Sequence, residues 1–311
     1  MLFILAACSS DTPTGSNSPT GPAPNSLKPD VVSKSSVHQD DSEQQPTSSD
    51  LQNAITSHGV ESVGCSEALT WEKGGEGLND CASSGRGAIF SRVELQVFQG
   101  GDTFGAQYFF MMTTEVTQGF YQKVMGSPLD TSQCNVKGNS ADLSPNQPAY
   151  CISWLDAVKF ANALSEQLNL ETCYQVERSS KIWPNSLECK GFRLPTPVEW
   201  SWAFKGNGVS SVVGLNERVW HQGNSNSRTH SVASLKPNGF GLYDLAGNVS
   251  EWVYEDPDPG PNRQVLGGEH RVYRGGSAGD GTELVIKGAK GDAHYSHKDA
   301  GVGFRLVRTA D

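Results

Sequence analysis

The 311-residue sequence has little hydrophobic content, a shortage of basic residues and no long apolar run. Hydrophobic residues make up 36% of the chain, and the formal net charge at pH 7 is −10. Nonspecific binding to nucleic-acid phosphates needs clustered Lys and Arg, so we expect no nucleic-acid partner. The one strongly apolar stretch, residues 2–8, is far too short to span a bilayer.

Cysteine is absent after Cys189, and no two of the seven cysteines have the close spacing that zinc sites favour. Six cysteines follow Cys8, and they fall into three neighbouring pairs. A loop of this size closed by a disulfide contributes about 3 kcal/mol in the chain-entropy model. We predict three structural disulfides, and the neighbour pairing is favoured over other pairings: Cys65 with Cys81, Cys134 with Cys151, and Cys173 with Cys189.

The first eight residues resemble the end of a bacterial lipoprotein signal. Residues 5–8, Leu-Ala-Ala-Cys, match the lipobox, in which the cysteine is acylated and becomes the mature N-terminus. The basic and apolar segments that normally come first are missing, so we expect the true start to lie upstream. The alternative is a chance Ala-Ala-Cys. We predict that Cys8 is lipidated and anchors an exported protein to a bacterial envelope membrane, the outer membrane being favoured, or to the cell surface.

The chain divides by composition into three parts. Residues 1–8 are the truncated signal, and residues 9–60, rich in Ser, Thr and Pro, predict a disordered tether. Residues 61–311 remain as one domain of about 250 residues. The 34 glycines indicate many turns and irregular segments rather than long helices.

Within this domain the pattern predicts an α+β fold with few helices, short strands and long structured loops. Apolar residues at helical spacing, each run preceded by a capping residue, predict three helices that begin after Thr117, Ser153 and Thr196. Alternating or β-type residues predict strands at 92–98, 108–110, 271–274 and 302–308.

Residues 237–252 combine turn-forming residues, buried-type aromatics and two carboxylates. Asp244 and Glu251 flank the turn at Gly247 and Asn248, and a chain that folds back there aims both carboxylates at one point. The carbonyl groups of Gly247 and Val249 complete an oxygen set that suits Ca²⁺. The alternative is that Asp244 caps a turn and Glu251 is solvated.

Five segments follow one another in a recognisable order: residues 114–118, 191–200, 237–252, 274–277 and 303–307. In this order they resemble the sulfatase-modifying-factor family, whose type member is the formylglycine-generating enzyme. The resemblance implies a variant of the C-type lectin fold, and it places a family calcium site on Asp244, Gly247, Val249 and Glu251.

The chemistry of the type member does not transfer with this resemblance. The enzyme has two copper-binding cysteines, three and eight residues after a serine that matches Ser277, and those places hold Asp280 and Val285. Cu(I) needs thiolates, so we expect no copper. The tryptophan of the enzyme's oxygen pocket is replaced by Ser250.

No other catalytic set can be read from the sequence. His294 and His297 lack a third metal ligand nearby and are interpreted as surface residues, and no nucleophile has an adjacent base. We therefore favour a non-catalytic binding or structural module, with residues 277–300 as a variable surface for an envelope protein or glycan. The alternative is a formylglycine-generating oxidase that acts on a sulfatase cysteine.

Overall fold

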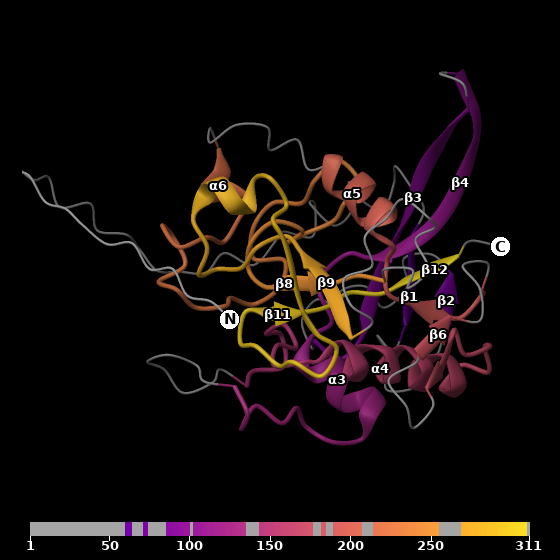
Figure 1. Cartoon of the computed structure of the whole chain (residues 1–311), viewed down its shortest axis with the longest axis horizontal. Coiled ribbons are helices and arrows are strands. Elements are labelled where there is room, and N and C mark those ends of the chain that lie inside the picture. The colour runs from indigo at the N-terminus through magenta and orange to yellow at the C-terminus, as the bar shows by residue number, and fades with distance from the viewer. Residues whose placement is uncertain are drawn as a thin grey trace, which may run out of the picture. The chain divides into compact units, whose positions relative to one another are not determined.

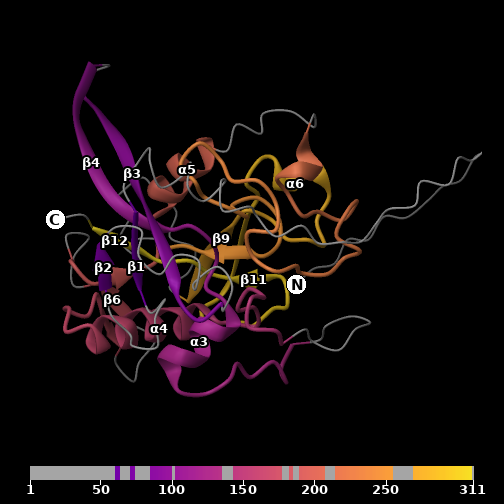
Figure 2. The same ribbon diagram turned by 180° about the vertical axis from the view of Figure 1, so that it is seen from behind.

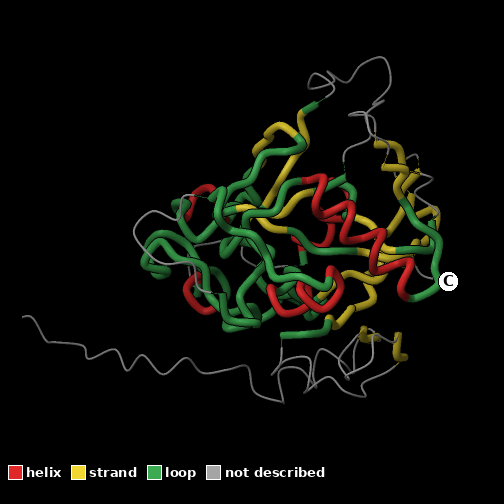
Figure 3. Tube along the Cα trace, turned by 90° about the horizontal axis from the view of Figure 1, so that it is seen from below, coloured by secondary structure: helices red, strands yellow, loops and turns green. Residues whose placement is uncertain are grey.

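The computed structural model describes residues 60–63, 71–73, 85–99, 102–134, 143–176, 182–184, 189–206, 214–254 and 269–309. All of them belong to one compact unit. Short strands, a few helices and long loops alternate along the chain, which confirms the α+β class (Figure 3). Among the described residues, no helix is both long and apolar enough to cross a membrane.

The predicted lipid-attachment segment at residues 1–8 lies outside the described residues. So does the predicted tether at 9–60, apart from its last residue. Val60 already belongs to strand β1 (Val60–Val63), so the folded part begins at least one residue earlier than predicted.

The larger sheet is built around a long hairpin. Strands β3 (Ala88–Gln99) and β4 (Asp102–Met112) pair along their length, and the hairpin extends beyond the strands beside it (Figures 1 and 2). The sheet order is β2-β1-β3-β4-β12-β7, and every neighbouring pair is antiparallel. The remaining strands of this sheet are β2 (Trp71–Lys73), β7 (Phe192–Arg193) and β12 (Val307–Thr309).

A second sheet has the order β10-β9-β8-β11. Its strands are β8 (Ser250–Trp252), β9 (His270–Arg274), β10 (Lys290–His294) and β11 (Val302–Gly303). Strands β5 (Tyr174–Val176) and β6 (Ile182–Pro184) form a separate ribbon. Strand β8 is the end of the segment 237–252, so the second sheet holds that segment from one side.

The predicted single strand at 302–308 is wrong, because the chain forms two short strands in different sheets. Between β11 and β12, the Phe304 carbonyl accepts a hydrogen bond from the Val116 amide, and the Leu306 carbonyl accepts one from Met112. Arg305 lies between them, fully buried. The crossover lets this arginine point into the interior between the two sheets.

The three predicted helices are confirmed as α3 (Gln118–Met125), α4 (Trp154–Gln167) and α5 (Pro197–Lys205), which begin after Thr117, Ser153 and Thr196. In α4 and α5 the cap accepts from the amide of the third helical residue, whose carboxylate bonds back to the cap, as in a capping box. The short helices η1 (Leu215–Glu217) and α6 (Thr282–Val285) were not predicted, because each spans less than two turns.

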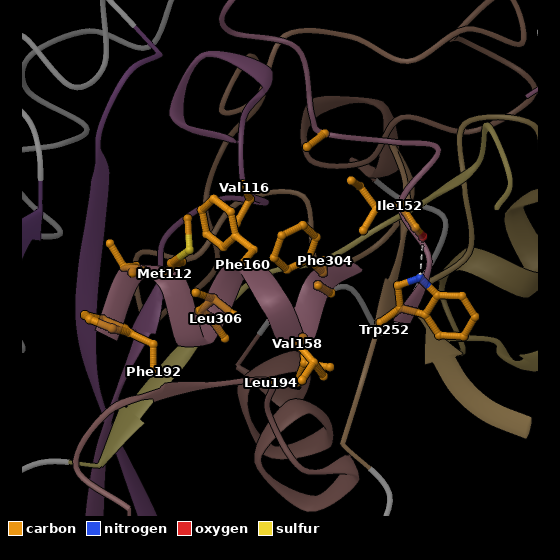
Figure 4. Packing of buried hydrophobic residues seen from close by; sticks show 14 of the residues in the cluster. Met112, Val116, Ile152, Val158, Phe160, Phe192, Leu194, Trp252, Phe304 and Leu306 are labelled. Atoms are coloured by element: carbon orange, nitrogen blue, oxygen red, sulfur yellow. Dashed lines mark hydrogen bonds between the residues drawn. The ribbon is translucent and has the colours of Figure 1, made fainter. Parts of the chain in front are cut away.

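The larger sheet is covered on both faces. Met112 points to the side of α4, where Phe160, Phe192 and Leu306 pack with it (Figure 4). Met111, the preceding residue of β4, points to the opposite side and joins Trp200 of α5. This alternation is the ordinary period of a strand, and it places the segment 237–252 in the α5 layer through Leu242 and Leu245.

Two of the three predicted disulfides are confirmed. Cys134 is bonded to Cys151, and Cys173 to Cys189. Cys65 and Cys81 lie outside the described residues, so the third bridge stays a prediction.

Candidate functional site

The segment 237–252 is held by side chains that bond to distant backbone. The side-chain carbonyl of Asn238 accepts from the amides of Phe240 and Leu242, and its amide group donates to the Ala203 carbonyl of α5. Trp252, at the other end, donates its indole N–H to the Ile152 carbonyl at 2.7 Å (Figure 4). The segment is an irregular loop whose two ends are fixed to the helical layers.

The turn at residues 247 and 248 contacts other loops closely. Gly247 has φ 79°, and a Cβ there would lie 1.9 Å from the Trp220 carbonyl oxygen, so only glycine fits. Asn248 is fully buried, and its side chain bonds to the His230 backbone and to the carboxylate of Glu115. These contacts join four separate stretches of chain at one turn.

Arg305 and Glu251 form a buried ion pair behind this turn. The Glu251 Oε1 atom lies 2.8 Å from Arg305 Nε and 2.6 Å from Nη2, and Oε2 accepts from the indole of Trp200 at 2.8 Å. The remaining guanidinium donors reach the carbonyl groups of Met112, Thr113 and Tyr243. Glu251 is therefore a buried ion-pair partner, and the alternative that it is solvated is wrong.

Two more buried carboxylates share this interior. Burial raises the pKa of the Asp244 carboxyl to about 6, although the hydrogen bond from the Ala233 amide to Oδ2 works in the opposite direction. Burial, followed by the charge of Asp244, raises the pKa of the Glu115 carboxyl well above its ordinary value. Three buried carboxylates thus surround one buried guanidinium.

The oxygen atoms predicted to hold Ca²⁺ can be tested one by one for fit. Among the described residues, no amide or side chain donates to the carbonyl groups of Gly247 and Val249, or to Oδ1 of Asp244. Buried carbonyl groups without a donor are uncommon and need an explanation, and a bound cation would provide one. Glu251 could contribute only the lone pairs that Arg305 and Trp200 leave.

The fit is partial, because calcium takes about six to eight oxygen ligands. No three His, Cys, Asp or Glu side chains of the described residues are grouped closely enough to hold a metal ion by themselves. A cation here would depend on the two carbonyl groups and on water. The calcium site at Asp244, Gly247, Val249 and Glu251 therefore stays a prediction.

The two positions that correspond to the copper-binding cysteines carry other structural roles. Oδ2 of Asp280 accepts from the amide of Ser277 at 2.7 Å and from its hydroxyl group at 2.8 Å, which closes a local turn. Val285 is fully buried in a small cluster with Leu215, Val219 and Ala246. Neither side chain can supply a soft metal ligand.

Residues 277–300 form a surface whose backbone is fixed at both ends and which carries many exposed side chains. The Ala278 amide bonds to the Asn248 carbonyl, and the Asp299 carbonyl accepts from the Cys151 amide, which ties the two ends to the loops at residues 248 and 151. Between these ends many side chains are exposed, among them Glu283, Lys287 and His297. A rigid backbone with outward side chains is the usual design of a recognition surface.

The histidines in this surface behave as predicted. His294 is partly exposed, bonds to the Ser296 hydroxyl and pairs with Glu269 at 3.4 Å.

Tyr273, which the sequence did not single out, lies half-buried near three aspartates. Burial, followed by the charges of Asp299, Asp292 and Asp280, raises the pKa of its phenol.

The residues that sequence reasoning missed are Glu115 and Arg305. Both lie within segments that carry the family resemblance, but nothing in their spacing links them. An arginine inside an otherwise apolar alternating segment was the one signal that could have indicated a buried charge at Arg305.

Comparison with known proteins agrees with this architecture. The family model described as the sulfatase-modifying factor enzyme 1-like domain matches residues 99–310. A chaperone protein named LppX, from Paenibacillus barcinonensis, is 26% identical over 226 residues, which cover 58% of this chain and 76% of that protein. The formylglycine-generating enzyme of Streptomyces coelicolor is 29% identical over 171 residues.

The overlap with the enzymes is limited in length. The chain spans 46% of the Streptomyces coelicolor enzyme and 35% of the mouse enzyme.

Among solved structures, Treponema denticola variable protein 1 has a TM-score of 0.57 at 29% identity, with 72% of this chain and 96% of that chain covered. The structure titled CarF has a TM-score of 0.50, also at 29% identity.

Proposed function

Because this chain belongs to the sulfatase-modifying factor enzyme 1-like family, we propose that it is an envelope-anchored binding module without formylglycine-generating activity. Its ligand, an envelope protein or glycan, contacts the surface formed by residues 277–300. The lipid on Cys8 holds the module at the membrane, and residues 9–60 act as the spacer.

The proposal rests on the residues that stand at the positions of the enzyme's two copper-binding cysteines. Asp280 is engaged in a turn with Ser277, and Val285 fills an apolar cluster. A copper-dependent oxidation needs two thiolates there, and the chain contains no cysteine after Cys189. The same segment keeps a fixed backbone, which suits binding.

Two relatives support a binding role. One is described as a chaperone protein, and the other, of known structure, is described as a variable protein. Neither description names an oxidase. The similarity to the variable protein extends over 72% of this chain.

The catalytic alternative has a direct test. Purified protein is incubated with copper and a sulfatase-type Cys-x-Pro-x-Arg peptide, and the aldehyde is measured against a blank without protein. We expect no aldehyde above the blank. Aldehyde formation that is lost on removal of copper would overturn the proposal.

The binding surface is tested with a matched pair of variants. Envelope extract is passed over the immobilised protein. The bound components are compared between a double variant, Lys287→Glu with Lys290→Glu, and the control variant Lys236→Glu. Lys236 is exposed but lies outside residues 277–300. Loss of the same component with the first variant alone supports the surface, and equal capture by both contradicts it.

Anchoring is tested by fractionation. The chain is expressed with its upstream signal, and the Cys8→Ala variant is expected to leave the membrane fraction. Membrane attachment that does not change in this variant would show that no lipid on Cys8 holds the protein.

The proposal also includes a structural calcium ion at Asp244, Gly247, Val249 and Glu251. The two carbonyl groups without a donor and the excess of buried negative charge support it. With a dissociation constant of about 10⁻⁵ M, 1 mM Ca²⁺ would stabilise the fold by about 2.7 kcal/mol. Identical unfolding in calcium and in chelator would show that the ion is absent.

A further inference from the structure

We propose that the Cys134–Cys151 disulfide is a redox-sensitive clamp on the C-terminal end of the surface at residues 277–300. A dithiol protein of the envelope that reduces this bridge releases that end of the surface, whereas the Cys173–Cys189 bridge stays closed. The inference rests on the binding surface proposed above, because it concerns the regulation of that surface. The clamp itself can be tested without a ligand.

Cys151 belongs both to the disulfide and to the attachment of the surface. Its sulfur is bonded to Cys134, and its amide donates to the Asp299 carbonyl at 3.0 Å. Cys151 is fully buried in a small cluster that includes Val249, and Ala300 packs against the same cluster. One residue therefore holds the covalent bridge and the end of the surface.

The backbone of Cys151 adopts a conformation that cysteine rarely takes. Its φ angle is 61°, in the left-handed region, where a Cβ atom crowds the neighbouring carbonyl oxygen. Surrounding contacts must hold such a residue in place. The φ angle sets the direction of the N–H group relative to the Cα–Cβ bond, so the sulfur reaches Cys134 while the amide points to Asp299. Opening the bridge removes a covalent restraint, and relaxation to a negative φ turns the amide away from Asp299.

The two confirmed bridges differ in how easily a reductant reaches them. Thiol–disulfide exchange needs direct contact between the attacking thiolate and a sulfur atom. Cys134 is partly exposed and follows two exposed residues, Ser132 and Gln133. Cys173 and Cys189 are 1% and 2% exposed and lie in the core around α4. Reduction of the folded protein therefore starts at Cys134, whereas the second bridge is attacked only after the core opens.

The reduction is a two-electron exchange with a dithiol. A thiolate of the reductant attacks the Cys134 sulfur, which breaks the bond to Cys151 and forms a mixed disulfide. Cys151 leaves as a thiolate and takes up the proton that the attacking thiol has lost. The second thiol of the reductant then displaces Cys134 and gives up its own proton to it. The protein gains two thiols, and the reductant ends as a disulfide.

The release is limited to the last residues of the surface. Tyr295 stays attached, because its amide donates to the Glu269 carbonyl at 2.8 Å. The opposite end stays attached through the hydrogen bond from the Ala278 amide to the Asn248 carbonyl. Strand β10 and the N-terminal end of the surface therefore keep their places when the bridge opens.

Among the described residues, the other polar contacts of residues 296–300 are weak or local. Lys298 pairs with Asp156 at 3.1 Å, but both side chains are partly exposed, and solvent weakens such a pair. The Gly301 amide donates to the Asp299 carboxylate at 2.7 Å, which is a contact within one turn. Opening the bridge therefore loosens residues 296–300 as a short segment.

Graded reduction tests the order in which the bridges open. Native protein is incubated with increasing concentrations of dithiothreitol, thiols are trapped with iodoacetamide, and labelled peptides are quantified by mass spectrometry. Cys134 and Cys151 should be labelled at least about tenfold faster than Cys173 and Cys189, while circular dichroism shows a folded chain. Equal rates, the opposite order, or unfolding that accompanies the first labelling would overturn the inference.

Hydrogen exchange tests whether the bridge holds the end of the surface. The wild type is compared with the double variant Cys134→Ala with Cys151→Ala and with the control double variant Cys173→Ala with Cys189→Ala. Only the first double variant should exchange about tenfold faster at residues 296–302, with no change at residue 278. If this variant does not fold, exchange is measured on selectively reduced wild type.

Two exchange results would contradict the clamp. Unchanged exchange at residues 296–302 would show that other contacts hold the segment. Equal acceleration throughout the domain would show that the bridge only stabilises the fold. Failure of the binding surface gives a different result: capture from envelope extract would not depend on Lys287 and Lys290, while the order of reduction and the exchange at residues 296–302 would stay as expected.

Discussion

The α4 layer and the loop layer around residues 237–252 bury polar groups in different ways. In α4, the capping contacts are local: Ser153 bonds to Asp156, three residues away. In the loop layer, Asn248 reaches Glu115 across 133 residues, and Arg305 reaches Met112 across 193. The N-terminal cap of α4 is satisfied within its own sequence, whereas the buried polar groups of the loop layer depend on partners supplied by the rest of the chain.

This difference predicts where the molecule tolerates change. A helix cap can be lost with a small local effect, because the apolar face of α4 still packs against the sheet. In the loop layer, a buried side chain that bonds to several distant groups, here called a hub, cannot be removed with only a local effect. Its removal leaves several charged or polar groups without partners. Substitutions in the two layers test this contrast directly.

The largest effect is expected for Arg305→Met. The change keeps much of the side-chain volume but leaves Glu251 and three carbonyl groups without their donor, so we expect a loss of about 3–5 kcal/mol in the free energy of unfolding. Urea unfolding measures it. Lys236→Met, which breaks an exposed pair, should cost about 1 kcal/mol or less. Similar losses for the two variants would contradict the hub role of Arg305.

The two confirmed disulfides allow a second comparison. Cys134–Cys151 packs with Val249 beside the loop layer, and Cys173–Cys189 belongs to the α4 core. Replacing both cysteines of either pair by alanine should cost about 3 kcal/mol, because the loops are of nearly equal length. Only loss of the first pair should also weaken the calcium response. Alkylation of native, unreduced protein should find no free thiol at these four positions.

Gly247→Ala separates crowding from backbone conformation in the loop layer. Gly247 and Gly214 have similar positive φ angles, 79° and 73°, but a Cβ at Gly214 meets nothing within 4 Å. Gly214→Ala should therefore cost only the conformational penalty of about 1–2 kcal/mol. Gly247→Ala should cost about 1–3 kcal/mol more, because its Cβ overlaps the Trp220 carbonyl. If urea unfolding shows the same loss of free energy of unfolding for both variants, the loops that contain Gly247 and Trp220 move apart at little cost.

The same contrast explains what the sequence could predict. The helices after Thr117, Ser153 and Thr196 were predicted with their caps, because both the signal and the contact lie within a few residues. The strands at 92–98 and 108–110 were found from alternation for the same reason. The segment 237–252 was recognised as irregular and tightly held, since its turn residues and aromatics are also local signals.

What the sequence could not show is which distant groups meet. The pairing of Arg305 with Glu251 splits a strand that alternation alone predicts as continuous, because the buried guanidinium takes its acceptors from four residues outside that strand. Glu115 gives no local sign that it faces the central turn. The family resemblance supplied candidate ligand positions, but the surplus charge that surrounds them appears only in three dimensions.

The smallest effect is expected at the cap of α4. Ser153→Ala removes the acceptor of the Asp156 amide and one arm of the capping box, so we expect a loss of about 1 kcal/mol. The loss should be the same in calcium and in chelator, because α4 lies outside the cation site. Ser153→Thr should keep most of the stability, since its hydroxyl group can both accept from the Asp156 amide and donate to the Asp156 carboxylate. A loss as large as that of Arg305→Met would show that the α4 layer also depends on a single polar contact, and the contrast between the two layers would fail.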